Sequence, residues 1–349
     1  MKENNVITTQ ADHNSILTLK GDYYQIGFQI GKLFRKQRHI MAKKVLKIME
    51  KDETVKPYLQ QVENMLKRDY DYIYQELVGR SVGAGVSLET LLYDLSGEIR
   101  DSEEENCTSI MVNTKNNIVL AHNEDGSYNK DNIRPVKLCY DNGNTFLDII
   151  TTSSCPSYTV LVREEFIYTI NYIWFNQYNW NYLPVHLFLR VLAECTDIQS
   201  LFEAIESVPL ASAVGLNICD RITGKMYYIE KVLDKFSVKN VDGVNIHANH
   251  LMHEPFLKYR VPFAEMNDDT TYQRQMVAEL LLDNRKDLTA QEVYDILTFR
   301  KTNDLNSILS TGTNGYSCVT YATYVFDFNK DSSTLHIHDK KQNVLNFKL

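Results

Sequence analysis

The sequence predicts an α+β protein in which two antiparallel β-sheets are stacked between helical layers. Two observations favour this class. Helical periodicity dominates from Tyr23 to Ser96, and short strand-like runs become frequent only after Arg100. The order along the chain is helices, strands, a helix pair, strands, helices and strands. Because neighbouring strands follow one another as hairpins, the pattern argues against a doubly wound parallel sheet.

The helices are predicted from apolar residues that recur every three or four positions. Ile26, Ile30 and Leu33 share one face, and a second amphipathic run extends from 59 to 77. Residues 79–85 contain three glycines but lack the Lys-Ser/Thr pair of a phosphate loop, so we expect a tight turn between helices there. Later helices are expected at 184–192 (opened by Pro184), 198–207, 272–282 and 290–300, and Ser87 is expected to begin a helix before them.

Strands are predicted where short runs rich in β-branched and aromatic residues are bounded by turn residues. The first two, 109–112 and 118–122, flank a polar turn and are expected to form a hairpin. The other expected strands are 136–140, 146–151, 158–162, 166–172, 215–219, 226–230, 244–248, 317–328 and 334–338.

Composition and charge exclude several classes of protein. The chain is 44% hydrophobic and 23% charged, which is typical of a folded globular protein. Its formal net charge of -8 argues against nucleic acid as a main partner, and we interpret the basic run 34–44 as a solvated helix face. No stretch approaches the roughly 18 apolar residues of a membrane span. The polar segment 1–10 lacks the apolar core of a secretory signal, so we expect a cytoplasmic protein that does not contact membranes.

The six cysteines lie far apart, without a CxxC pair or a histidine at zinc spacing, which predicts buried thiols and no metal site. Cys107 is the exception, since it stands between an acidic run and the first hairpin. The second strand of that hairpin ends in Ala121-His-Asn-Glu-Asp125-Gly126, and two strands of equal length return this end close to Cys107. Asp125 then either orients a group on Cys107 or simply forms an Asp-Gly turn.

A second polar cluster, His247-Ala-Asn249-His250, overlaps the end of the predicted strand 244–248. Alternate residues of a strand share a face, so His247 and Asn249 are expected to point the same way. An asparagine on an inner face must be hydrogen-bonded. That requirement fits a functional amide and a satisfied core residue equally well.

Four motifs in this order resemble the acyl-coenzyme A:6-aminopenicillanic acid acyltransferase-like family, a group of self-processing cysteine hydrolases. The resemblance covers most of the chain, from about residue 19 to about residue 328. The motifs are Gly21-Asp-Tyr-Tyr-Gln-Ile-Gly27-Phe-Gln-Ile-Gly31, then Gly83-Ala-Gly85-Val-Ser-Leu-Glu-Thr-Leu-Leu92, then Asn106-Cys107-Thr-Ser leading to Asn123-Glu-Asp125, and finally His247-Ala-Asn249-His250.

The resemblance implies an N-terminal-nucleophile hydrolase fold, a four-layer αββα sandwich, made as a precursor that cuts itself between Asn106 and Cys107. Residues 1–106 would form a mainly helical α-chain and residues 107–349 a β-chain, the two remaining one structural unit. By the same resemblance Cys107 is the nucleophile. Asn249 is an oxyanion-hole donor, Asp125 belongs to the hydrogen-bond network of the site, and His247, Asn123 and Asn171 are its neighbours.

The chemistry explains why such a cysteine becomes a chain terminus. A free α-amino group has a pKa of about 7.7–8.0, against about 10.4 for lysine, so it can take the proton of its own thiol near neutral pH. The implied substrate is an N-acyl amide, a small peptide or an acyl thioester, and neither a cofactor nor a metal is needed.

Two positions depart from the family pattern. Asn106 stands where the penicillin acyltransferases have glycine, and in the late part of the chain only Arg300 and Lys301 are candidates for a site residue. A papain-like pair of Cys107 and His247 is a rival interpretation, but Cys107 leads into strands and not into a helix. An uncut, inactive small-molecule-binding scaffold of the same fold is the other alternative, against which the presence of Cys107, Asp125 and Asn249 argues.

Overall fold

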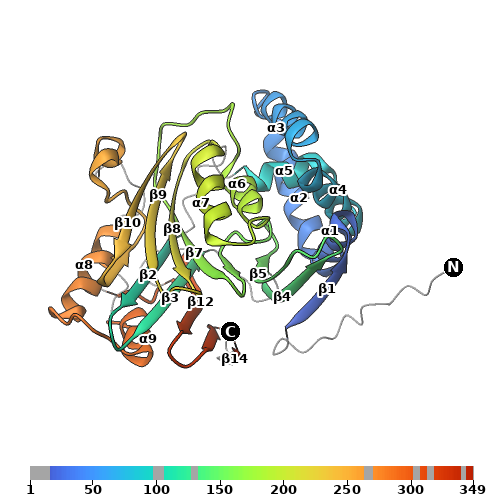
Figure 1. Ribbon diagram of the computed structural model, residues 1–349. Coiled ribbons are helices and arrows are strands. Elements are labelled where there is room, and N and C mark those ends of the chain that lie inside the picture. Colours follow the sequence, from blue (N-terminus) through green and yellow to red (C-terminus); the bar gives the residue numbers. More distant parts are fainter. Residues whose placement is uncertain are drawn as a thin grey trace.

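The computed structural model describes residues 16–96, 106–126, 133–262, 270–301, 307–312, 318–338 and 343–348. They form four layers, namely helices, an eight-stranded sheet, a six-stranded sheet and a second layer of helices (Figure 1). The predicted α+β class with two stacked sheets between helical layers is therefore confirmed.

The N-terminal part of the chain is one short strand followed by helices, and the periodicity predicted the helices. Its elements are β1 (Leu17–Gly21), α1 (Tyr23–Leu33), α2 (Arg35–Met49), α3 (Val55–Asp69), α4 (Asp71–Ala84) and α5 (Leu88–Leu95). The Asp22 side chain and Gln25 form a capping box at the start of α1, and Ser87 caps α5 as predicted. Strand β1 pairs in parallel with β4, so this segment contributes an edge strand to the eight-stranded sheet.

The eight-stranded sheet has the order β1-β4-β5-β6-β7-β8-β9-β10, and the six-stranded sheet the order β11-β2-β3-β12-β13-β14. The larger sheet contains β4 (Ile133–Tyr140), β5 (Thr145–Thr151), β6 (Val160–Val162), β7 (Phe166–Tyr172), β8 (Ala213–Asp220), β9 (Met226–Val232) and β10 (Lys235–Val241). The smaller sheet contains β2 (Asn106–Asn113), β3 (Ile118–Gly126), β11 (Gly243–His247), β12 (Val319–Asp327), β13 (Ser332–Ile337) and β14 (Asn343–Lys348). The predicted β2–β3 hairpin is present and antiparallel.

The alternation of side chains along β2 explains how the layers are held together. Met111 belongs to the apolar core between the two sheets, whereas its neighbours Ile110 and Val112 belong to the core beneath the second helical layer. That layer consists of α8 (Thr270–Leu282) and α9 (Ala290–Leu297). Odd-numbered residues of β2 therefore face the other sheet, and even-numbered residues face α8 and α9.

The larger core lies between the eight-stranded sheet and the first helical layer, which also includes α6 (Val185–Leu192) and α7 (Ile198–Ser207). Figure 1 shows α6 and α7 against this sheet, beside the N-terminal helices. Pro184 precedes α6 as its N-cap, one position earlier than the first-turn proline that we expected. A short 3₁₀ helix, Glu254–Tyr259, follows β11.

The glycines of segment 79–85 do not form the turn that we predicted. Gly79 and Gly83 lie inside α4 and pack against α1, where a Cβ on Gly83 would come within 2.1 Å of the Phe28 carbonyl oxygen. On α1, a Cβ on Gly27 would come within 1.9 Å of the Glu76 carbonyl oxygen. The glycines therefore allow two helix backbones to touch. Only Gly85, at φ +70°, ends a helix as a turn glycine does.

Three short strands were not predicted, namely β1, β10 and β14. A further difference concerns β11, which ends at His247, one residue earlier than expected. Asn249 and His250 lie two and three residues beyond this end of the strand, so the prediction that His247 and Asn249 share a strand face is wrong. Beyond the end of β11 the Asn249 side chain, and not a further strand residue, lies beside Cys107 of β2.

Candidate active site

Cys107 is the second residue of β2 and lies where the smaller sheet ends. The residue is 1% exposed. The β11–β2 ladder stops at the pair His247 and Ser109, so no strand neighbour on that side accepts the backbone N–H of Cys107. Instead this N–H donates to Oδ1 of Asn249 at 3.0 Å. The structure thus brings together the two residues for which the sequence motifs predicted a shared role.

Arg274 of α8 is the residue that the sequence analysis missed. Its side chain is buried, and its guanidinium donates to the carbonyl oxygen of Cys107, to Asn249 Oδ1 at 2.8 Å and to Asn106 Oδ1 at 3.1 Å. A further bond goes to Thr108 Oγ1 at 2.7 Å. The guanidinium therefore holds the backbone of Cys107 on one side of the predicted cut and the side chain of Asn106 on the other. One signal was available, since an arginine on the buried face of a helix needs partners.

The late-chain candidates lie elsewhere. Arg300 and Lys301 are both exposed, whereas Arg274 already supplies a buried cation at Cys107. In the segment 302–317 that follows them, residues 302–306 and 313–317 lie outside the described residues. Exposed side chains do not share the site that the buried Arg274 forms.

The amide of Asn249 has one orientation that satisfies its surroundings. Two donors, the Cys107 N–H and the Arg274 guanidinium, approach the same atom, which must therefore be the oxygen. Nδ2 lies on the other side and donates to the carbonyl oxygen of Tyr172 at 2.8 Å. An amide nitrogen carries two hydrogens, and this bond uses one of them.

The side chain of Cys107 points toward the other sheet and meets a buried polar network. Its Sγ lies 3.8 Å from Oε2 of Glu124, the residue directly opposite on β3. The same Oε2 lies 2.9 Å from Nε2 of His122. His122 Nδ1 lies 2.8 Å from Ser109 Oγ, which in turn lies 2.8 Å from Asn171 Oδ1. Asn171, predicted as a site neighbour, therefore belongs to the far end of this network.

Burial dominates the electrostatics of these groups. It raises the pKa of the Cys107 thiol well above its ordinary value, and the nearby Glu124 and Asp125 carboxylates raise this pKa further. Burial lowers the pKa of His122 to about 3, so this imidazole is neutral at pH 7. Burial also raises the pKa of Asp125 to about 6, although Arg274 and a hydrogen bond from Thr320 act in the opposite direction. A protonated thiol in such a place needs a base before it becomes a nucleophile.

Asp125 and Asn123 point to the side of the sheet that faces the second helical layer. Asp125 is the register partner of Asn106 and accepts a hydrogen bond from Thr320 Oγ1. Asn123 donates to the Leu297 carbonyl oxygen at 2.8 Å and is tied to α9. His247 lies 2.8 Å, through Nε2, from the His250 carbonyl oxygen. Asn123 and His247 therefore lie near the site because their strands pair with β2, and their side chains have no described contact with Cys107.

Three of these side chains could in principle hold a metal ion. The ligand atoms of Cys107, His122 and Glu124 lie within 4.8 Å of one another, and no other such group of three is present among the described residues. Ligands about 2.1 Å from a tetrahedral zinc would be about 3.4 Å apart. The 2.9 Å between His122 Nε2 and Glu124 Oε2 is instead the length of a hydrogen bond. The arrangement therefore fits proton exchange better than metal binding.

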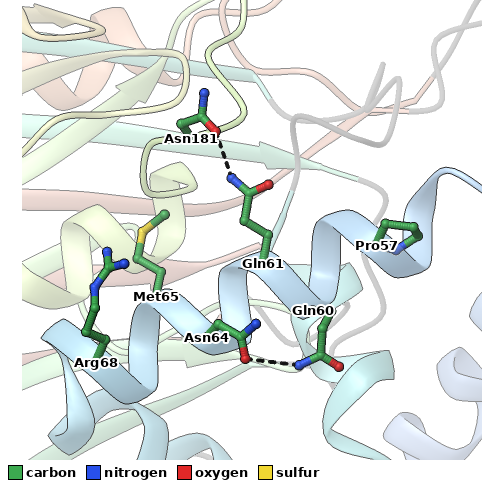
Figure 2. Close-up of a pocket in the computed structure, with 7 residues that line it drawn as sticks. All are labelled: Pro57, Gln60, Gln61, Asn64, Met65, Arg68 and Asn181. Carbon is green, nitrogen blue, oxygen red and sulfur yellow. Dashed lines mark hydrogen bonds between the residues drawn. The ribbon is translucent and has the colours of Figure 1, made fainter.

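Two surface hollows lie away from Cys107. The larger, of about 440 Å³, lies along α3 and is lined by polar side chains such as Gln60 and Asn64, with Gln61 turned toward Asn181 (Figure 2). The smaller, of about 310 Å³, is lined by residues of β9, β10 and the segment after β11, including His253. The α3 hollow contains no nucleophile, and neither hollow includes Cys107. None of the helices in the described part of the chain is both long and apolar enough to cross a membrane.

Comparison with known proteins gives a family and a distant structural likeness. Residues 112–342, about two thirds of the chain, match the sequence model of the family described as acyl-coenzyme A:6-aminopenicillanic acid acyl-transferase. The match includes Asp125 and Asn249 and begins five residues after Cys107. No curated protein matches the sequence. Among solved structures, a Caenorhabditis elegans N-acylethanolamine-hydrolyzing acid amidase ortholog is 14% identical with a TM-score of 0.45, and the match covers 70% of this chain and 100% of that chain.

Proposed function

The chain belongs to the acyl-coenzyme A:6-aminopenicillanic acid acyltransferase family, and we propose that it is a self-processing amidohydrolase or acyltransferase with Cys107 as its nucleophile. One observation carries the proposal. The backbone nitrogen of Cys107 is held by Asn249 and its carbonyl oxygen by Arg274, while its sulfur faces a buried carboxylate. A cysteine that served only to fill a core would not need its backbone bound by two buried polar side chains from distant elements.

In the proposed reaction the chain first cuts itself between Asn106 and Cys107. The new α-amino group of Cys107 then takes the thiol proton, and the thiolate attacks the carbonyl carbon of an N-acyl amide, a small peptide or an acyl thioester. The leaving amine or thiol departs from an acyl-enzyme on Cys107. Water resolves this intermediate in a hydrolase, and an amine resolves it in an acyltransferase.

Asn249 has two roles in this proposal. Its Oδ1 accepts from the Cys107 nitrogen before the cut and continues to hold that nitrogen afterwards, since an amine also donates. Its Nδ2 donates one hydrogen to Tyr172, and the second hydrogen is the proposed donor to the oxyanion. Removing such a donor typically costs about 2.7–4 kcal/mol of transition-state stabilisation.

The burial of Cys107 supports an inactive precursor. At 1% exposure its sulfur is closed to a substrate, and its raised thiol pKa leaves little thiolate at pH 7. In the proposal, cutting the Asn106–Cys107 bond both creates the amine base and frees the chain at the nucleophile. An uncut chain is therefore expected to have no amidase activity.

The test is the intact mass of the purified protein under denaturing conditions, beside a Cys107→Ala control. Two chains of 106 and 243 residues in the wild type, and one chain of 40.5 kDa in the control, are expected. A cut wild type is then screened against N-acyl amino acids, small peptides and acyl thioesters. A wild type that remains one chain of 40.5 kDa contradicts self-processing and favours the inactive binding scaffold.

A further inference from the structure

Self-cleavage faces a problem that the mature enzyme does not have. In the uncut chain the nitrogen of Cys107 is an amide that donates its hydrogen to Asn249 Oδ1. An amide nitrogen has no basic lone pair, so the α-amino group that serves the mature enzyme does not yet exist. The thiol of Cys107 is also buried, and burial raises its pKa. The first attack of Cys107 on the Asn106 carbonyl therefore needs another base.

One carboxylate faces the sulfur directly. Cys107 and Glu124 are register partners on antiparallel strands, so their side chains leave the sheet on the same face. Sγ of Cys107 and Oε2 of Glu124 are 3.8 Å apart, and both residues are almost fully buried. The adjacent carboxylate, Asp125, is opposite Asn106, leaves the sheet on the other face and accepts from Thr320. Geometry therefore selects Glu124 over Asp125.

His122 holds the carboxylate at this position. Its Nε2 lies 2.9 Å from Glu124 Oε2, and the ring is anchored at its other nitrogen by Ser109. Ser109 Oγ also accepts from Asn217 Nδ2 at 3.0 Å, and Asn217 Nδ2 lies 2.7 Å from Asn171 Oδ1. The imidazole is completely buried and neutral at pH 7, so it carries one hydrogen, on one of its two nitrogens.

The network has a hydrogen-bonded arrangement for each protonation state of Glu124. When Glu124 is ionised, His122 Nε2–H donates to it and the Ser109 hydroxyl donates to His122 Nδ1. When Glu124 is protonated, its O–H donates to His122 Nε2, Nδ1–H donates to Ser109, and the Ser109 hydroxyl turns to Asn171 Oδ1. The network can change between the two arrangements because the Ser109 hydroxyl has two acceptors at 2.8 Å, His122 Nδ1 and Asn171 Oδ1. A group that keeps its hydrogen bonds in both states is suited to accept and release a proton.

We propose that Glu124, positioned by His122, takes the thiol proton of Cys107 during self-cleavage of the uncut chain. The proposal rests on the proposed function, because it supplies the base for the self-cleavage step. It makes Glu124 a catalytic residue of that step and His122 a positioning residue.

The atoms balance as follows. The Cys107 thiol proton passes to Glu124, and the Sγ–C bond to the Asn106 carbonyl carbon forms. The C–N bond between Asn106 and Cys107 breaks, and the proton on Glu124 passes to the departing nitrogen, which becomes an amine. Water then attacks the Asn106 thioester, so that the hydroxyl joins the carbonyl carbon and a proton returns to the sulfur. One amide and one water give one carboxylic acid and one amine, with no other reactant.

The experiment follows cleavage of the full chain after a short pulse of cell-free synthesis, with the fraction of the cut chain measured by gel at successive times. Glu124→Gln keeps the volume and removes the base, and it is expected to slow cleavage by at least about 100-fold. Glu230→Gln is the matched control, because Glu230 is a buried carboxylate on β9 that accepts from Tyr228 and from the backbone N–H of Met252. It is expected to leave the cleavage rate unchanged.

Two variants of His122 separate positioning from packing. His122→Gln keeps a donor toward Glu124 and is expected to retain cleavage, whereas His122→Leu removes it and is expected to slow cleavage. The titratable and charged groups that the described contacts place around Glu124 are Cys107 on β2 and His122 and Asp125 on β3, with Arg274 of α8 on the opposite face of the sheet. His122→Leu removes the donor to the Glu124 carboxylate, so the pH at which cleavage slows on acidification should change in this variant. A purely structural role of the ring would not change that pH.

Each outcome is informative. If the wild type is cut and Glu124→Gln is cut as fast, the role of Glu124 is overturned while the proposed function stands. If the wild type itself stays whole, the proposed function fails and the role of Glu124 fails with it. If Glu124→Gln does not fold, Glu124→Asp decides, since it keeps the charge but withdraws the carboxylate from the sulfur. Slowed cleavage in that variant supports the proposal, and the wild-type rate overturns it.

Discussion

Asp125 gives the sharpest prediction about how stability depends on pH. The residue is 1% exposed, and burial raises the pKa of its carboxyl from 3.8 to about 6 in the folded chain. Folding therefore disfavours the ionised form. The sign is opposite to that of an ordinary salt-bridged carboxylate, because the folded pKa is the higher one. The contribution of Asp125 to stability is present below pH 3.8 and is lost as the pH rises through about 6.

The size follows from the shift. A shift of about two pKa units is about 3 kcal/mol in full, at about 1.36 kcal/mol each, and about 2 kcal/mol of it falls between pH 4 and pH 7, because the unfolded carboxyl is already partly ionised at pH 4. Asn in place of Asp125 has nearly the same shape and cannot ionise. In an uncut Cys107→Ala background, the free energy of unfolding of Asp125→Asn, minus that of its parent, should therefore rise by about 2 kcal/mol from pH 4 to pH 7. Asp148, whose pKa burial raises to about 7, affects both proteins alike and cancels.

The assay is urea unfolding at pH 4, 5, 6 and 7 of both proteins in the Cys107→Ala background. A third protein, Thr320→Val, removes the hydrogen bond that lowers the pKa of Asp125, so its stability should fall more steeply with pH than that of the parent. A difference between Asp125→Asn and its parent that stays constant across the four pH values would refute the reasoning. It would mean that Asp125 ionises in the fold as readily as in the unfolded chain.

Three further outcomes are expected. Gly83→Ala should lower the free energy of unfolding by about 1–3 kcal/mol, because α1 leaves no room for a Cβ at this position. Val82→Ala, on the exposed side of α4, is the control and should change it little. Equal melting temperatures of the two variants would contradict the close contact between α1 and α4. Arg274→Lys should slow self-cleavage at least tenfold, since one ammonium cannot reach both the Cys107 carbonyl and Asn249, and pulse synthesis measures this. Dialysis against a chelator should change neither cleavage nor the melting temperature, because the atoms near Cys107 are spaced as hydrogen bonds, and a loss that zinc restores would argue for a metal site.

Much of the fold was accessible from local pattern, and the strands that were missed show the limit. Strand β10 (Lys235–Val241) is an edge strand with largely solvent-accessible side chains, so it lacks the apolar alternation by which strands are recognised. Strand β1 has only five residues and a single neighbour, β4, which lies more than a hundred positions later. Pairing of that kind is decided by the tertiary fold and leaves little trace in the sequence.

The glycines of α4 show a different limit. A cluster of glycines predicts a turn when only the chain's own neighbours are considered. Gly79 and Gly83 are four residues apart, so both face the same side of a helix, and they allow contact with the backbone of Tyr24 and Phe28 on α1. The sequence carried the spacing, but its meaning depended on a second helix whose position no local rule provides.

At the site, the sequence predicted which polar residues lie close to Cys107, but it did not predict which of them contacts the sulfur. The hairpin argument brought His122, Glu124 and Asp125 close to Cys107, yet it did not say which would face the sulfur. A shift of one residue in strand register exchanges the two faces. The observed pairing of Cys107 with Glu124 assigns the carboxylate next to the thiol, and it sends Asp125 to the opposite face.

The two proposed bases are Glu124 in the uncut chain and the α-amino group of Cys107 in the cut one. Together they explain how a buried, unreactive thiol can still be activated for self-cleavage. A buried thiol with a raised pKa is inert, which suits a precursor, but the same burial hinders the attack that would end the precursor state. In the proposal the Glu124 carboxylate, on the sulfur's own face and held by His122, is the base in the uncut chain, and the released amine is the base in the cut one. Asn249 Oδ1 accepts from the nitrogen of Cys107 in the uncut chain. In the proposal it also accepts from the released amine, so the nucleophile need not move when the base changes. Such a division predicts that a chain lacking the Glu124 carboxylate is impaired in maturation and not in turnover once cut.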